Sequence, residues 1–212
     1  MQFPGGKWGC AVAMLNAASK GRKAAFCDKT VVCRSGKAGL GFQTLEKGTM
    51  EYFLSTGEKG PKAGEFYKKS PQLARNYMSE IPEPTSKEYV VFVPLNELLA
   101  DQHPDAVVFL ANADQISGLA TLANYDKKTQ DHVKVLFGAG CVQAIRYPMA
   151  EEEKNGDCCY IGLTDPSARK CIDKDILSFS IPWHRFLEME EEAEGSFLTK
   201  ETWNQIARRI VS

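Results

Sequence analysis

The chain has 212 residues, of which 43% are hydrophobic and 25% are charged, and its formal net charge is −1. Such a chain buries a core without disulfides, and its even charge balance argues against nucleic-acid binding and against adsorption to an anionic membrane. No apolar run approaches the roughly 20 residues that span a bilayer, and no signal-peptide pattern opens the chain. We therefore expect a cytoplasmic single domain, residues 1–212, from which a leading segment could be missing.

The first part of the chain predicts helices around one short strand. Apolar residues recur at helical spacing over residues 8–20. A strand-like run and a glycine-rich loop follow in KAAFCDKTVVCRSGKAGLGF, and TMEYFLSTG predicts a short helix. Ser70 and Pro71 are typical of the N-cap and first turn of a helix, which we expect to end near Glu80.

Strands and helices alternate over the rest of the chain. The predicted strands are YVVFVPL, DAVVFLAN, HVKVLF, CCYIGL and ILSFSIP. The predicted helices are residues 96–101, QISGLATLANY capped by Asp114, CVQAIRY, WHRFLEMEEEA, and KETWNQIARRI capped by Thr199. This alternation favours the α/β class, as a mixed α+β layered fold with a mixed sheet and flanking helices. The acidic run 188–194 is expected to be a solvated helix face.

Seven cysteines without an export signal indicate free thiols in a reducing compartment. Their spacing fits neither a zinc finger nor a ferredoxin, so local spacing is a weak signal for metal. Cys33 opens the loop CRSGKAGLGF, and Cys141 follows FGAG at a predicted helix start, where N–H groups favour a thiolate. For Cys158, Cys159 and Cys171 we expect ordinary core packing.

Several blocks of the sequence, in order from Lys7 to Ile206, resemble one family. The blocks are KWGCAVAMLNAASKG, CRSGKAGLGF, YFLSTG, VVFLANADQISGLATLANY, FGAGC, GLTDPSARK and FSIPWHRFLEMEEEAEGSFLTKETW. They are similar to the uncharacterised ArCR family, domain-of-unknown-function family 169. The resemblance implies that Cys10, Cys33 and Cys141 belong to the family pattern, whereas the other four cysteines do not. It implies no reaction.

The chain departs from the family pattern in two loops. Relatives commonly have Cys-Pro-Gly-Gly where this chain has CRSG at residues 33–36. They tend to have Asn-Pro-Asp-Gln where it has NADQ at residues 112–115. Both differences fall in loops that could belong to a site, so the pattern transfers to this chain only residue by residue.

The first functional hypothesis is a cofactor held by the three family cysteines. Thiols that are distant in sequence can converge in the fold. Three of them would leave one ligand position open on a zinc ion or hold an iron–sulfur cluster. We therefore predict that Cys10, Cys33 and Cys141 bind zinc, an iron–sulfur cluster or another small ligand, with a redox role as one option.

Two alternatives remain, and the sequence does not decide whether the protein is an enzyme. In one, Cys141 is a nucleophile activated by loop N–H groups and a base, for which the chain offers three histidines. In the other, a non-catalytic module binds an anionic small molecule. The candidate contacts for such a ligand are Arg34, Gln115, Asp165 and Arg169. Asp165 and Arg169 could instead form a structural ion pair at i, i+4 spacing.

Overall fold

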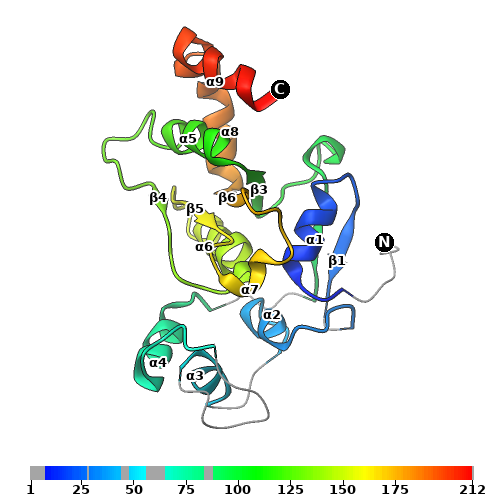
Figure 1. The fold of residues 1–212 in the computed structure, drawn as a ribbon. Coiled ribbons are helices and arrows are strands. Elements are labelled where there is room, and N and C mark those ends of the chain that lie inside the picture. The colour runs from blue at the N-terminus through cyan, green and yellow to red at the C-terminus, as the bar shows by residue number, and fades with distance from the viewer. Residues whose placement is uncertain (1–7, 28, 44–47, 56–64, 84–87, 212) are drawn as a thin grey trace.

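The structure of the chain is a computed structural model that describes residues 8–27, 29–43, 48–55, 65–83 and 88–211 (Figure 1). In these residues, helices combine with a four-stranded sheet and a two-stranded sheet. The predicted fold class, a mixed α+β fold with a mixed sheet and flanking helices, is therefore confirmed.

The larger sheet has the strand order β3-β6-β5-β4. Its strands are β3 (Ala106–Ala111), β4 (Val133–Lys134), β5 (Cys159–Gly162) and β6 (Leu177–Pro182). The pairs β3–β6 and β5–β6 are antiparallel, and β4 runs parallel to β5. The strand predicted in HVKVLF is only two residues long, because the segment leaves the sheet after Lys134. The carbonyl of Leu136 instead accepts a hydrogen bond from the Gln143 side chain, at 2.7 Å.

Alternating side chains divide the core between the two faces of this sheet. Cys159 and Ile161 of β5 belong to one apolar cluster, and Tyr160 between them belongs to the other. The helices that cover the two faces are α5 (Ala113–Leu122) and α8 (Trp183–Ala193) on the first, and the π-helical segment η2 (Val142–Arg146) and α6 (Tyr147–Glu153) on the second. The sheet is thus the middle of three layers.

A smaller unit near the N-terminus extends the second layer. Strand β1 (Ala24–Phe26) pairs antiparallel with β2 (Val90–Phe92), and α1 (Ala11–Ala18) packs against this pair. Val12 of α1 is fully buried in the same apolar cluster as η2. The helix predicted from residue 8 begins only at Ala11, because the backbone of Trp8 pairs with another segment.

The remaining elements are short or peripheral. They are η1 (Leu95–Glu97), α2 (Arg34–Gly39), α3 (Thr49–Leu54), α4 (Pro71–Glu80), α7 (Pro166–Arg169), η3 (Phe197–Thr199) and α9 (Glu201–Val211). Helices α3 and α4 pack on each other around a cluster of their own, at the end of the molecule opposite α9 (Figure 1). The glutamates of the acidic run 188–194 are exposed on α8, as predicted.

The helix caps test the sequence predictions most closely. Ser70 caps α4 as predicted, since its hydroxyl accepts from the Leu73 N–H at 3.3 Å. The prediction for Asp114 is wrong. Asn112 is the N-cap of α5, because Asn112 and Gln115 exchange two hydrogen bonds in a capping box. The prediction for Thr199 is also wrong, because its hydroxyl donates to the Ser196 carbonyl within η3.

Candidate cysteine site

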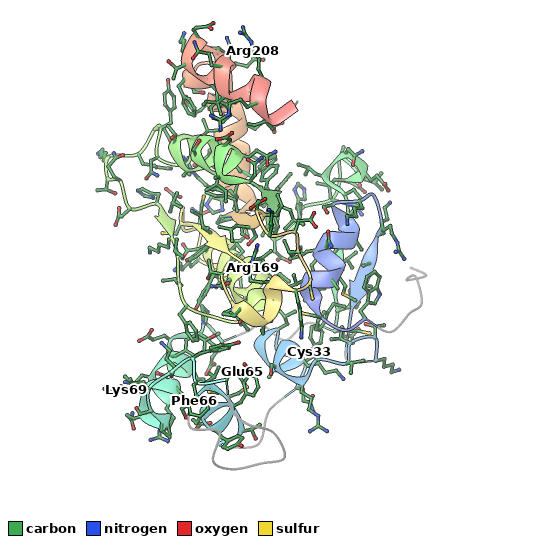
Figure 2. The ribbon with its side chains drawn as sticks, in the orientation of Figure 1. Cys33, Glu65, Phe66, Lys69, Arg169 and Arg208 are labelled. Carbon is green, nitrogen blue, oxygen red and sulfur yellow. The ribbon has the colours of Figure 1, made fainter. Side chains whose placement is uncertain are left out.

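Four helices begin close together, and the residue at each N-cap is a cysteine or an aspartate. Cys10 stands at the N-cap of α1, Cys33 at that of α2 and Cys141 at that of η2. Asp165 is the N-cap of α7. Figure 2 shows Cys33 on α2 and Arg169 on the neighbouring α7. Cys33 and Asp165 accept hydrogen bonds from backbone N–H groups of the helices that they begin, at 3.3 and 3.0 Å, whereas Cys10 and Cys141 make no such side-chain cap bond.

Backbone pairing brings the first two cysteines together. Trp8 and Val31 form a parallel bridge, in which the Trp8 N–H donates to Thr30 at 2.8 Å and the Val32 N–H donates to Trp8 at 3.0 Å. Cys10 and Cys33 each lie two residues beyond the bridge, so they occupy matching positions on the two segments. A hydrogen bond joins their thiols, with Cys10 as the donor.

This contact makes the two thiols chemically unequal. The hydrogen bond from Cys10, against the opposing effect of burial, lowers the pKa of Cys33 to about 6, and the N–H groups of Gly36 and Ser35 add to the effect. The Gly36 N–H lies 3.3 Å from the Cys33 sulfur. The same hydrogen bond, together with burial, raises the pKa of Cys10. At neutral pH the pair therefore consists of a Cys33 thiolate and a Cys10 thiol.

Cys141 completes the cysteine group from the other side. Its sulfur lies 3.7 Å from the place where a Cβ on Gly39 of α2 would be. Burial, followed by the charge of nearby Cys33, raises the pKa of Cys141 to about 12. A nucleophilic cysteine needs an accessible thiolate, so these surroundings do not favour the predicted role of Cys141 as nucleophile. Cys33 is half-exposed and ionised and is the better candidate.

The glycines before Cys141 permit this close approach. A Cβ on Gly140 would lie 2.8 Å from the Cβ of Ala168 in α7 and 3.0 Å from a methyl group of Val12 in α1. Both distances are shorter than an ordinary van der Waals contact. A Cβ on Gly138 would lie 3.2 Å from the Tyr77 hydroxyl. The Gly-Ala-Gly-Cys sequence therefore lets α1, α7 and η2 meet at the cysteines.

Asp165 is a buried carboxylate beside the cysteines. It accepts hydrogen bonds from the Gly140 N–H at 3.3 Å and from the Ser167 N–H and hydroxyl at 3.0 and 2.7 Å. Its negative charge acts to raise the pKa of both Cys33 and Cys141, which places it within their electrostatic reach. The turn before it is strained, because Leu163 is fully buried with a φ of 60°, where a branched side chain is rare.

The other predicted ligand contacts have structural partners. Arg169 donates to the carbonyls of Leu163, Asp173, Lys174 and Ile176, so it closes the loop after α7. In the part of the chain that the structure describes, no salt bridge joins it to Asp165, and the predicted ion pair is wrong. Gln115 is engaged in the α5 capping box, away from the cysteines. Arg34 is exposed on the first turn of α2, directly after Cys33.

Residues of α4 and its surroundings form an aromatic wall that the sequence did not reveal. Tyr77, Tyr67 and Phe137 make edge-to-face contacts, and the Lys68 ammonium lies 4.3 Å from the Phe137 ring centre. Burial raises the pKa of Tyr77, and the charges of Tyr147, Cys141 and Asp165 add to this rise. The wall therefore adjoins the cysteine site. A tyrosine on a buried helix face carries no sequence signal beyond packing.

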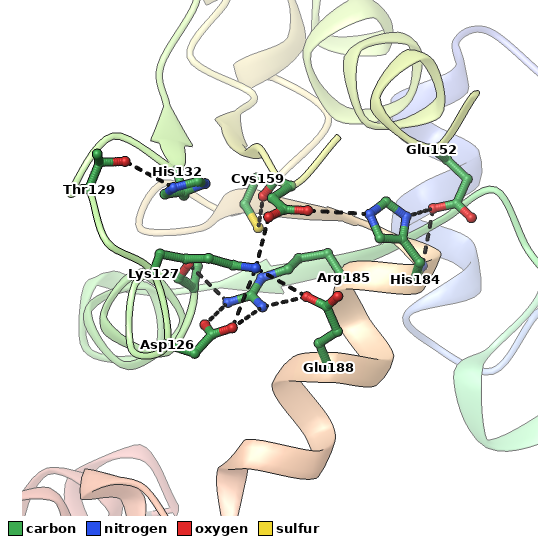
Figure 3. A network of polar contacts seen from close by, with 11 residues as sticks. Asp126, Lys127, Thr129, His132, Glu152, Cys159, His184, Arg185 and Glu188 are labelled. Carbon is green, nitrogen blue, oxygen red and sulfur yellow. Dashed lines mark hydrogen bonds and ion pairs between the residues drawn. The ribbon is translucent and has the colours of Figure 1, made fainter. Parts of the chain in front are cut away.

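An ionic network is centred on α8, on the face of the sheet opposite the cysteines, and reaches α6 through Glu152 (Figure 3). Arg185 of α8 is completely buried and binds both carboxylate oxygens of Asp126, at 2.9 and 2.5 Å. Lys127 bridges to Asp157 at 2.8 Å. His184 lies between Glu152, at 2.6 Å from its Nδ1, and Asp157, at 3.6 Å from its Nε2.

Among the described residues, no group of three or more histidine, cysteine, aspartate or glutamate side chains is arranged as a site for one metal ion. Cys159 is fully buried, as predicted for core packing, while Cys158 and Cys171 are half-buried. The structure thus brings Cys10, Cys33 and Cys141 together without the tight spacing of ligands to a single ion.

Comparison with known families gives one result. The family model described as DUF169, uncharacterised ArCR, matches residues 1–192, which include the three cysteines and end before α9. No curated protein and no solved structure matches the chain. Within the described segments, we find no helix with the length and apolar character needed to cross a membrane.

Proposed function

The chain belongs to the uncharacterised ArCR family, and we propose that it binds a thiophilic metal centre through Cys10, Cys33 and Cys141. The centre is an iron–sulfur cluster or a soft ion such as zinc. The observation that carries the proposal is the convergence of three free cysteines, each at the start of a different helix. A reducing, cytoplasmic location is part of the proposal, because such ligands must remain reduced thiols.

The protonation states of the three thiols support a role in metal binding. Cysteine ligates metals as the thiolate, and Cys33 already carries that charge at neutral pH. Cys10 and Cys141 have raised pKa values and keep their protons. A metal centre would displace those two protons, so affinity should rise with pH.

The lack of a compact three-ligand group among the described residues leads us to propose a cluster in preference to a single ion. One zinc ion needs all its ligand atoms at about 2.0–2.3 Å, and the described residues contain no group of three so arranged. In a cluster, each cysteine binds a different iron atom, so the sulfurs stand further apart. Three cysteines would leave one iron without a protein thiolate, and a small ligand could bind there.

The test is anaerobic reconstitution with ferrous iron and sulfide, followed by iron analysis and spectroscopy. We expect the wild-type protein to retain iron and sulfide and to absorb light at about 400 nm. Cys10→Ser, Cys33→Ser and Cys141→Ser should each lose most of the iron. Cys171→Ser is the matched control, because Cys171 is also free and half-buried. Equal amounts of retained iron in Cys33→Ser and Cys171→Ser would overturn the proposal. If the protein bound zinc and no iron–sulfur cluster, the cluster form of the proposal would be wrong.

Catalysis by a cysteine nucleophile is a second candidate, which the lowered pKa of Cys33 favours. The nucleophile would then be Cys33 instead of Cys141. Selective modification of Cys33 by iodoacetamide at pH 7 in metal-free protein would support an accessible thiolate. If Cys141 were modified first, the assignment to Cys33 would be wrong.

A further inference from the structure

We propose that Cys10 and Cys33 form a reversible dithiol–disulfide couple, and that the disulfide withdraws two of the three thiols from the site. The couple follows from the geometry of the two segments. Its effect on metal binding rests on the function proposed above. The couple would make cofactor binding depend on the oxidation state of the protein.

Backbone pairing two residues before the cysteines brings their segments to a spacing that suits a disulfide. The bridge between Trp8 and Val31 fixes the parallel register of the segments two residues before the cysteines. Cys10, with φ −153° and ψ 154°, and Cys33, with φ −69° and ψ 109°, both have extended backbones and lie two residues beyond this isolated bridge. Paired strands lie about 4.7–4.9 Å apart, and disulfides join Cα atoms about 4.4–6.8 Å apart.

The two side chains interact, and both are partly exposed to solvent. The interaction lowers the pKa of Cys33 and raises that of Cys10, which places the two sulfurs within reach of each other. Cys10 and Cys33 are half-buried, whereas only 4% of Cys141 is exposed. A small oxidant therefore reaches the pair before it reaches the third cysteine.

With a hydroperoxide as the oxidant, the chemistry balances in two steps. The Cys33 sulfur attacks the peroxide, the O–O bond breaks, and Cys33 becomes a sulfenic acid while an alcohol or water leaves. The Cys10 sulfur then attacks the Cys33 sulfur, which forms the S–S bond and releases water. The two thiols lose two electrons and two protons in total, and both oxygen atoms of the peroxide are reduced. A dithiol reductant restores the starting state.

Oxidation of the metal-free protein with hydrogen peroxide tests the couple directly. Intact-mass and peptide mass spectrometry should show the loss of two hydrogen atoms and one cross-linked peptide pair that contains Cys10 and Cys33. Cys141→Ser and Cys171→Ser should form the same cross-link. Cys10→Ser should instead give a Cys33 sulfenic acid that dimedone traps. A different pairing in the wild-type protein, or a Cys33 sulfinic acid without any cross-link, would overturn the proposal.

Iron uptake by the oxidised and the re-reduced protein separates this proposal from the first. Oxidised protein should take up less than about a tenth of the iron that re-reduced protein takes up. If the cross-link forms but re-reduced protein takes up no iron, the couple stands and the metal proposal fails. If iron is taken up equally before and after oxidation, the couple does not control the site.

Discussion

Two polar clusters lie on opposite faces of the four-stranded sheet, and they differ in how their charges are balanced. In the ionic network, buried Arg185 is matched by Asp126 and Glu188, and Lys127 by Asp157 (Figure 3). In the cysteine site, the Cys33 sulfur accepts a hydrogen bond from the Gly36 N–H and interacts with the Cys10 thiol.

The difference separates side chains that hold the fold together from side chains that remain available to a ligand. A buried cation surrounded by carboxylates already has its charge matched, and the network becomes costly once one member is removed. A thiolate that hydrogen bonds stabilise keeps the lone pairs with which it can bind a metal centre. The following predictions test this contrast, in order of the expected change in the free energy of unfolding.

Removal of the central cation should have the largest effect. In Arg185→Met, the carboxylates of Asp126 and Glu188 lose their buried partner. We expect the free energy of unfolding, measured by urea titration, to fall by about 3–5 kcal/mol. Arg208→Met on exposed α9 is the control and should change it by less than about 0.5 kcal/mol. A loss below about 1 kcal/mol for Arg185→Met would show that the network does not stabilise the fold.

A methyl group at the junction of the four helices should have the next largest effect. The added Cβ in Gly140→Ala would lie 2.8 Å from Ala168 and 3.0 Å from Val12, so these elements must move apart. We expect a loss of about 1–3 kcal/mol together with reduced iron retention. Gly9→Ala is the matched control, since its Cβ would meet no atom within 4 Å. Equal effects of the two substitutions would contradict the tight packing at Gly140.

Acid should weaken the ionic network. The hydrogen bond from Arg185 lowers the pKa of Asp126 to about 2 from its ordinary value of 3.8. The carboxylate therefore stabilises the folded state above pH 4, and this contribution is lost as the pH falls toward 2. Because Asp126 is exposed and its charge is screened by solvent, about 1 kcal/mol of the loss at most should be absent in Asp126→Asn, when urea titrations at pH 5 and pH 2.5 are compared. Asp175→Asn, at an exposed site, should retain the wild-type dependence.

The smallest effect on stability, and the clearest effect on reactivity, is expected at the thiol pair. The rate of Cys33 alkylation in metal-free protein should rise with pH with a midpoint near pH 6. In Cys10→Ala the midpoint should move up by at least about one pH unit, because the hydrogen bond from Cys10 is the largest cause of the low pKa. An unchanged midpoint would mean that backbone N–H groups alone stabilise the thiolate. Stability should change by less than about 1 kcal/mol.

Local patterns predicted much of the fold. The Ser-Pro start of α4 follows from capping chemistry, and the apolar segments that became β3 and β6 follow from their composition. The predicted N-cap was wrong where two polar residues compete for that position. Both Asn112 and Asp114 could cap α5, and Asn112 does so because Gln115 completes the capping box from three residues downstream.

The cysteine site could be predicted only in part. The resemblance to the family indicated the three cysteines, but their meeting depends on a backbone bridge between Trp8 and Val31 that no local pattern reveals. For Arg169, in contrast, a local pattern predicted a contact that the structure does not contain. Its i, i+4 spacing from Asp165 predicts an ion pair, yet the loop that follows α7 presents carbonyl groups that the guanidinium binds instead.

The π-helical turn has one further consequence. Residues 142–153 run without a break from η2 into α6, so one helical rod starts at Cys141 and carries Glu152 near its other end. Glu152 binds the His184 imidazole at 2.6 Å. Movement of Cys141 toward a ligand would therefore shift this helix and, at its other end, the Glu152 side chain that contacts the ring. The NMR chemical shifts of this ring should therefore report whether the cysteine site is occupied.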